Sequence, residues 1–114
     1  MLNEIKRNQW TTFFNEFSKR NRLRPTRIEV LGELGAQEAE RHLLLNGISV
    51  DETGSGAPRI EILLGGASPE DSQHLTHAIT QAMQVFPKTN VAGRDEALEI
   101  VDVTGSKTLL CFES

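Results

Sequence analysis

The sequence predicts an α+β domain in which an N-terminal amphipathic helix packs on an antiparallel β-sheet or a small open β-barrel of about five to six strands. Two observations favour this fold class. Aromatic residues recur at helical spacing near the N-terminus, and short apolar runs separated by glycine-containing turns make up most of the remainder. A chain of 114 residues fits a single domain over residues 1–114, with the helix at about 8–21 and the β-rich body at about 26–113.

The helix is predicted from aromatic residues at positions i, i+3, i+4 and i+7, which would share one helical face: Trp10, Phe13, Phe14 and Phe17. Asn8 is expected to cap this helix, and Pro25 ends it at roughly residues 20–22 because the residue before a proline avoids helical conformation. We expect the aromatic face to close the open side of the sheet, since a small domain needs its large apolar side chains inside. The alternative is a basic amphipathic helix that binds a membrane surface, a partner groove or nucleic acid.

The body begins with a strand, predicted where apolar and polar residues alternate up to Gly32. A second strand is expected over residues 38–45, reaching the turn signal Asn46-Gly47, with apolar residues beyond it that could continue the strand. The clearest strand covers residues 59–64, whose isoleucines and leucine alternate on one face, and Gly65-Gly66 ends it.

The C-terminal part predicts a hairpin of two apolar-rich runs, residues 97–103 and 107–112. Residues 68–88 fit two patterns. A serine, a proline and two acidic residues at the start of this segment have the chemistry of a helix start, and periodicity alone favours a helix. The alternative is a pair of short strands, residues 74–79 and 83–87.

Charge is divided unevenly along the chain. Residues 1–27 carry seven Lys and Arg against two acidic residues, whereas residues 28–114 carry five against fourteen, which gives the net charge of −4. The N-terminal segment therefore either meets an acidic partner or folds back on its own acidic body. Its densest part is a predicted basic patch: Lys19, Arg20, Arg22, Arg24 and Arg27.

Six short motifs extend over nearly the whole chain: Trp10-x-x-Phe13-Phe14-x-x-Phe17-Ser18, Glu29-Val30-Leu31-Gly32, Leu45-x-Gly47-Ile48, Thr76-His77-x-Ile79, Glu96-Ala97-Leu98-Glu99-Ile100 and Thr108-Leu109-Leu110-x-Phe112. Together they resemble a family of small uncharacterised bacterial proteins, the domain of unknown function family 5335. The resemblance implies strands rather than a helix within residues 68–88. It supplies no activity, cofactor or catalytic residue.

A metal site is the first chemical candidate, with Asp71, His74 and His77 as weak ligand candidates. On a helix these residues form i,i+3 pairs that could chelate partially, whereas on a strand His74 and His77 would point to opposite faces. No nucleophile–base–orienter set is recognisable, so we expect no catalytic and no cofactor-binding residues and no cofactor.

The leading functional hypothesis is a non-catalytic binding or regulatory module that acts through contacts with an unknown protein partner. The charge polarity is also compatible with a homodimer. A lone cysteine, Cys111, and the lack of a long apolar run favour a cytoplasmic protein without a membrane partner. Nucleic-acid binding through Lys19–Arg27 is the alternative, although the excess of acidic residues argues against it. A small enzyme with an unrecognised site is the third hypothesis.

Overall fold

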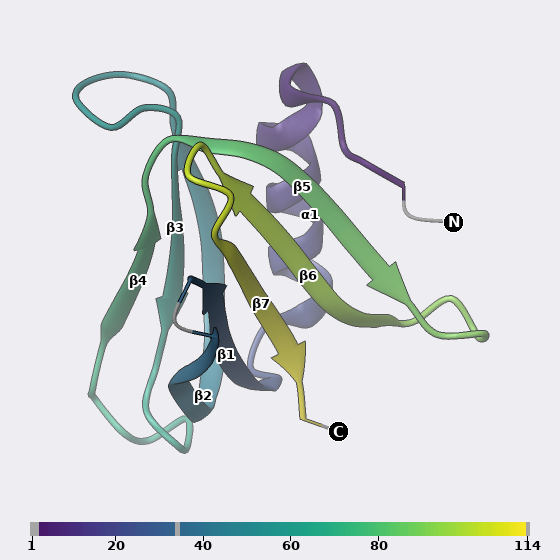
Figure 1. Cartoon of the computed structure of the whole chain (residues 1–114). Helices are drawn as coiled ribbons and strands as arrows, with labels where there is room; N and C mark the ends of the chain where they lie inside the picture. Colours follow the sequence, from purple (N-terminus) through teal and green to yellow (C-terminus); the bar gives the residue numbers. More distant parts are fainter. Residues whose placement is uncertain (1–2, 34, 114) are drawn as a thin grey trace.

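The computed structural model describes residues 3–33 and 35–113, without the side chain of Arg41. In these residues an N-terminal helix packs on an open antiparallel sheet (Figure 1), which confirms the predicted α+β class. The described elements are the 3₁₀ helix η1 (Arg7–Gln9), the helix α1 (Trp10–Asn21) and the strands β1 (Pro25–Gly32), β2 (Gly35–Asp51), β3 (Arg59–Leu64), β4 (Leu75–Ile79), β5 (Ala82–Thr89), β6 (Asp95–Asp102) and β7 (Lys107–Phe112).

The sheet has the strand order β4-β3-β2-β1-β7-β6-β5, and each neighbouring pair is antiparallel. Strands β4 and β5 follow each other in sequence yet lie at opposite edges, so the sheet curls until they meet at one corner (Figure 1). The N–H groups of Gln81 and Ala82 fasten this corner by donating to the carbonyls of Gly56, at 2.8 Å, and Pro58, at 2.9 Å. No described ladder joins β4 to β5, so the sheet stays open, which confirms the antiparallel sheet of the two predicted alternatives.

Residues 68–88 form strands and not the helix that periodicity favours. Within them lie β4 and most of β5, which agrees with the family resemblance. The apolar residues whose spacing suggested a helix belong to two separate strands, with Ile79 buried at the end of β4 and Val85 buried in β5. Because both strands form, the sheet has seven strands over the described residues, and the predicted number of five to six is too small.

The start of the helix differs from the prediction that Asn8 caps it. Asn8 lies inside η1, which runs directly into α1, and neither helix begins with a capping bond from a side chain. The 3₁₀ turn takes over part of the capping function, since the N–H of Gln9 donates to the carbonyl of Lys6 at 2.8 Å. The indole of Trp10 anchors the approach to this turn by donating to the carbonyl of Ile5 at 3.0 Å.

The aromatic face of α1 lies in the core of the protein. Trp10, Phe14 and Phe17 are at most 1% exposed, whereas Phe13 is half-buried at the edge of the same cluster. Phe17 stacks on Phe112 of β7 with ring centroids 5.8 Å apart. The helix therefore fills the concave side of the curled sheet, where burial of large aromatic surfaces is the strongest stabilising effect available to a small domain.

Strand β2 is longer than predicted because Asn46-Gly47 is not a turn. The strand continues through these residues with a register shift between Leu45 and Gly47 in its pairing with β3, which is a β-bulge. The helix approaches at this point: the N–H of Ile48 donates to Ser18 Oγ at 2.8 Å. Before the bulge β2 pairs with β1, and after it β2 pairs with β3, so this one strand joins the two halves of the sheet.

We expect Ser18→Ala to lower the free energy of unfolding by about 1 kcal/mol in urea denaturation. The substitution leaves the N–H of buried Ile48 without its acceptor, a loss of about 1–2 kcal/mol, and alanine returns about 0.5 kcal/mol through its higher helix propensity. Thr12→Ala on the exposed side of α1 is the control, because it reports the propensity gain alone. Equal stability of the two variants would contradict the role of Ser18.

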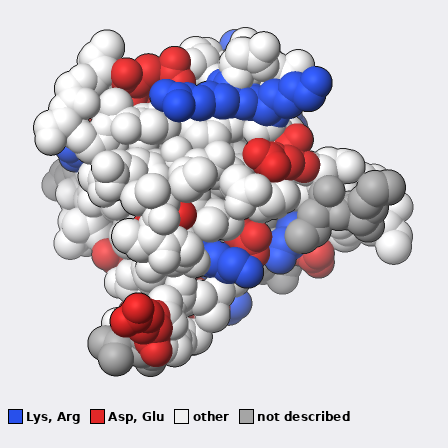
Figure 2. Space-filling view, turned by 45° about the horizontal axis from the view of Figure 1, so that its top comes forward, with Lys and Arg blue, Asp and Glu red and all other residues white. Residues whose placement is uncertain are grey.

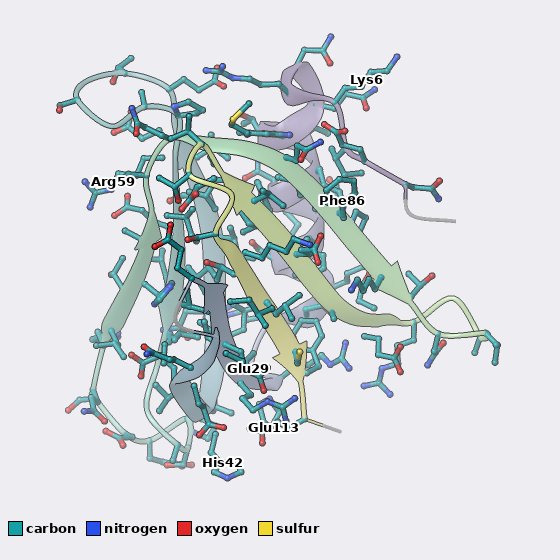
Figure 3. All side chains as sticks on the ribbon, in the orientation of Figure 1. Lys6, Glu29, His42, Arg59, Phe86 and Glu113 are labelled. Carbon is teal, nitrogen blue, oxygen red and sulfur yellow. The ribbon has the colours of Figure 1, made fainter. Side chains whose placement is uncertain are left out.

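The C-terminal hairpin forms as predicted, from β6 and β7, with Leu98 opposite Leu110 in the core. The chain end lies beside β2, where Glu113 Oε1 accepts from the backbone N–H of His42 and lies 3.0 Å from His42 Nδ1 (Figure 3). Among the described residues, the one α-helix is too short and too polar to cross a membrane.

Candidate functional site

The predicted basic patch is divided among three environments. Lys19 and Arg22 are exposed. Arg27 pairs with Glu29 along β1 at 2.9 Å, while Arg20 and Arg24 turn towards the start of β6. On the face that Figure 2 presents, basic side chains form one elongated stripe with acidic side chains next to it, and smaller basic groups lie apart from this stripe. Arg20 and Arg24 therefore fold back on the acidic body, which was one of the two alternatives drawn from the charge polarity.

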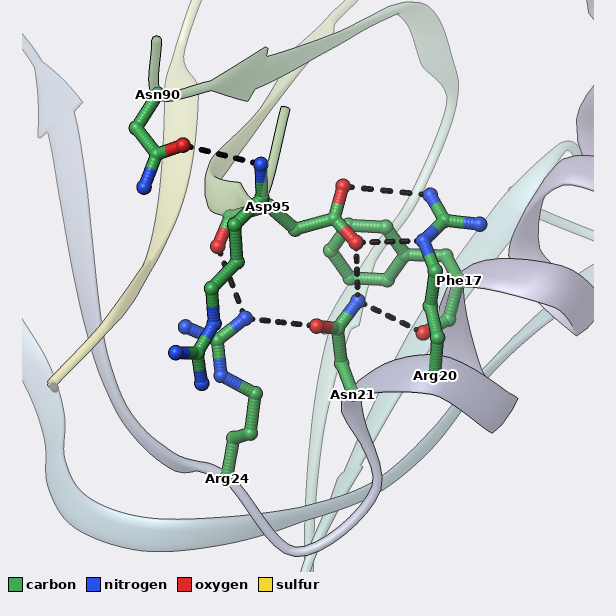
Figure 4. A network of polar contacts seen from close by, with 7 residues as sticks. Phe17, Arg20, Asn21, Arg24, Asn90 and Asp95 are labelled. Atoms are coloured by element: carbon green, nitrogen blue, oxygen red, sulfur yellow. Dashed lines mark hydrogen bonds and ion pairs between the residues drawn. The ribbon is translucent and has the colours of Figure 1, made fainter. Parts of the chain in front are cut away.

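Asp95 is the centre of a polar network between the end of α1 and the start of β6 (Figure 4). The residue is 7% exposed, and its Oδ2 accepts from Arg20 Nε at 2.6 Å and from Asn21 Nδ2 at 2.8 Å. Its Oδ1 accepts from Arg20 Nη2 at 3.3 Å, so the guanidinium meets the carboxylate as a fork. Both oxygens of this buried carboxylate are thereby satisfied.

Asn21 and Arg24 extend the network to the backbone. Asn21 Nδ2 also donates to the carbonyl of Phe17 at 2.9 Å, and Asn21 Oδ1 accepts from Arg24 Nη1 at 2.8 Å. The same Arg24 Nη1 donates to the carbonyl of Asp95 at 2.9 Å. The Arg24 guanidinium carbon lies 3.9 Å from the centroid of the Phe112 ring, which holds the side chain flat against β7.

The pKa values of Asp95 and Arg24 are both lowered, which favours the charged form of the carboxyl group and disfavours the charged form of the guanidinium. Burial alone would raise the pKa of Asp95, but hydrogen bonds from Arg20 and Asn21, with the charges of Arg20 and Arg24, bring that pKa below its ordinary value. The pKa of Arg24 is lowered by burial and then by the positive charge of Arg94, and the charge of Asp95 offsets this only in part. Arg24 is thus the member of the network whose charge is poorly compensated.

Arg94 reaches the network from the turn between β5 and β6. Asn90 closes this turn, because its Oδ1 accepts from the N–H groups of Ala92 at 2.9 Å and Arg94 at 3.0 Å, and Gly93 adopts a positive φ of 82°. A hollow of about 250 Å³ opens beside the turn, lined by Arg20, Asn21, Arg24, Gly93, Arg94 and Asp95. Three guanidinium groups and one carboxylate thus surround a small polar cavity.

The two edges of the sheet differ in how far they are protected. At the β5 edge, the N–H of Ile5 donates to the carbonyl of Val85 at 2.8 Å, so the N-terminal segment covers part of the strand. Pro87 and Lys88 also lie in β5, and both residue types discourage further strand pairing. This edge is therefore protected against addition of another strand.

The β4 edge has none of these protections. Its five residues, Leu-Thr-His-Ala-Ile, include no proline and no lysine, and no hydrogen bond from its outer side to another described residue is present. Leu75 is 37% exposed, and Thr76 and Ala78 are exposed. Among the described residues β4 pairs with β3 alone, so the backbone groups on its outer side are available for pairing with another chain.

The metal-ligand candidates do not come together. Asp71 and His74 line a small hollow with Gly66, whereas His77 lies in β4 opposite Ile62 and is absent from that lining. Burial lowers the pKa of His77, and the charge of Glu40 offsets this in part. In residues 3–33 and 35–113 no group of three or more His, Cys, Asp or Glu side chains is placed to hold a metal ion.

A larger hollow of about 690 Å³ lies between the tip of the β1–β2 hairpin and the β6–β7 turn. Glu33 and Lys107 are the charged residues of its described lining, and they carry opposite signs. This hollow therefore gathers no set of like charges and no cluster of titratable groups comparable with that at Asp95.

Sequence reasoning identified the basic residues but missed Asn21, Arg94 and Asp95 as members of a site. Arg94 and Asp95 were visible only as a charged entry to the C-terminal hairpin. Arg20 and Asp95 are separated by 75 positions, so no local motif links them. The one signal in the sequence was the difference in charge between the basic N-terminal segment and the acidic body. That difference does not indicate which residues pair.

Comparison with known proteins identifies the family of this chain. No curated protein matches the chain, and no solved structure matches it. The model of a family of unknown function, DUF5335, matches residues 1–114, the whole of the chain. The resemblance seen in the six sequence motifs is thereby confirmed, and the chain belongs to the DUF5335 family.

Proposed function

We propose that this chain is a non-catalytic binding module that acts through contact with another protein, and that β4 is the contact surface. The unprotected edge of β4, beside a protected β5 edge, is the observation that carries this proposal. A partner can add an extended segment antiparallel to β4, because backbone groups on the free side of an edge strand offer a row of hydrogen-bond donors and acceptors. The lone Cys111 supports a location in the bacterial cytoplasm, where thiols stay reduced.

The side chains of β4 indicate the chemistry of the partner segment. Because none of the five residues has a permanent charge, a charged partner strand would find no opposite charge within β4. Leu75 lies on the same face as buried Ile79, and its exposed surface would be covered by an apolar side chain of the added strand. We therefore infer an extended partner segment that is uncharged, with apolar residues on one face.

The test compares a charge placed on each edge. Thr76→Lys puts a lysine on exposed β4, and Met83→Lys puts the same charge on exposed β5, where Met83 is 56% exposed. Tagged wild-type protein and both variants are isolated from the native cells, and bound proteins are quantified by mass spectrometry. We expect a partner that wild type and Met83→Lys retain equally and that Thr76→Lys retains about tenfold less or worse.

Sedimentation of the three purified proteins provides the second measurement, because a second copy of the chain is also able to supply the added strand. A dimer that Thr76→Lys dissociates and Met83→Lys does not would identify the partner as the chain itself. Equal retention of bound proteins by both variants, with unchanged sedimentation, would contradict the proposal. Far-ultraviolet circular dichroism verifies that each lysine variant keeps its fold.

A further inference from the structure

The hollow at the α1–β6 corner contains positive charge that the protein does not neutralise. Three arginines line it against one carboxylate, and that carboxylate is occupied by Arg20 and Asn21. Arg94 is exposed, and its guanidinium has no hydrogen bond or ion pair with a described residue. The corner is therefore a region of excess positive charge on a chain whose net charge is −4.

Arg24 is held in place with part of its guanidinium still free. Its Nη1 donates to Asn21 Oδ1 and to the carbonyl of Asp95, and these two bonds use both hydrogens of that nitrogen. The remaining N–H groups of Arg24 have no acceptor among the described residues. Stacking on Phe112 at 3.9 Å restricts the plane of the group, so little side-chain entropy remains to be lost when a ligand binds.

We propose that this hollow is a binding site for a small oxyanion, a carboxylate or phosphate group, held between the guanidinium groups of Arg24 and Arg94. A guanidinium presents parallel N–H donors that match two oxygens of either group. A cavity of about 250 Å³ has room for such a group, though not for a whole nucleotide with all its contacts. The bound anion is a negatively charged partner for Arg94, whose guanidinium has none among the described residues.

Arg24 and Arg94 come from separate elements, which makes the pair a product of the fold. Arg24 follows α1, and Arg94 ends the turn that Asn90 closes through two backbone hydrogen bonds. Burial, and after it the charge of Arg94, lowers the pKa of Arg24, and an anion between the two guanidinium groups relieves their mutual repulsion. This site does not depend on the proposed role of β4, since β4 and β6 lie towards opposite ends of the strand order.

The test is a titration followed by nuclear magnetic resonance of ¹⁵N-labelled protein at constant ionic strength. Inorganic phosphate and sodium acetate are added separately in place of chloride. The observed groups are the backbone amide of Gly93 and the Nε–H groups of Arg24 and Arg94. We expect saturable shifts at these positions with phosphate, with acetate or with both, and the comparison identifies which oxyanion the site prefers.

Arg94→Gln is the diagnostic variant, and Arg22→Gln is its matched control. Both remove one positive charge from an exposed side chain, but Arg22 does not line the hollow. We expect Arg94→Gln to weaken anion binding about tenfold, as loss of a charge-assisted hydrogen bond does, and Arg22→Gln to leave it within about twofold. Shifts that fail to saturate with either anion, or equal affinity in the two variants, would overturn the proposal.

Discussion

Phe17→Ala should lower the free energy of unfolding by about 3–5 kcal/mol, the loss typical of a fully buried phenylalanine. Phe17 is 0% exposed and contacts both Phe13 on its own helix and Phe112 on β7. Its removal opens a cavity where α1 meets the sheet, and the neighbouring strands cannot collapse into that space without breaking their ladders. Urea denaturation monitored by the fluorescence of Trp10 measures the effect.

Phe13→Ala is the matched control for this substitution. Phe13 belongs to the same helix and the same aromatic cluster, but it is only half-buried, so its truncation should cost about 1–2 kcal/mol. A ratio of about two or more between the two losses would show that the helix is held through its buried face. Equal losses would mean that α1 is stabilised by its own aromatic contacts and not by the sheet.

The aromatic face of α1 could be predicted from the sequence because its cause is local. Four aromatic residues at a spacing of 3.6 define a helix face whatever the rest of the chain does, and burial of that face follows from the size of the domain. The path of β2 could not be predicted in this way, because its cause is not local. Asn46-Gly47 is a turn signal in isolation, but pairing with β3 and the contact of Ser18 with Ile48 extend the strand through it.

The site at the α1–β6 corner could not be predicted for a related reason. A periodic pattern indicates which residues are buried, but it does not indicate which acidic residue meets which arginine. The chain offers sixteen Asp and Glu residues, and only the curl of the sheet decides that Asp95 lies beside the end of α1. The charge polarity indicated that such contacts would exist, and the topology determines where they form.

Asp95→Ala should lower the free energy of unfolding by about 2–3 kcal/mol, the second largest effect that we expect. The substitution leaves one N–H of Asn21, which is 2% exposed, without an acceptor. Arg20 loses its partner too, but half of its side chain is exposed and water can hydrate it, so the loss stays below that of a fully buried ion pair. Glu96→Ala, at the exposed neighbouring position, should change stability by less than about 0.5 kcal/mol.

Asp95→Asn removes the charge of this residue but keeps its shape. The pH dependence of the free energy of unfolding therefore reports the contribution of the charge. The pKa of Asp95 in the folded protein lies below its ordinary value of 3.8, so the folded state binds this proton less readily than the unfolded state does. Its stabilising contribution is therefore complete above about pH 5 and is lost as the pH falls through the folded pKa. We expect the free energy of unfolding of the wild type to fall more steeply between about pH 5 and pH 2 than that of Asp95→Asn.

Asp51 must be considered in the same measurement, because hydrogen bonds from the backbone and hydroxyl of Thr53 also lower its pKa. Asp51 is present in both proteins, so its contribution cancels in the difference between wild type and Asp95→Asn. The remaining difference in slope belongs to Asp95 and the arginines that surround it. Parallel pH profiles would mean that the carboxylate is not preferentially ionised in the folded state, and that Arg20, Asn21 and Arg24 hold it by geometry without a charge preference.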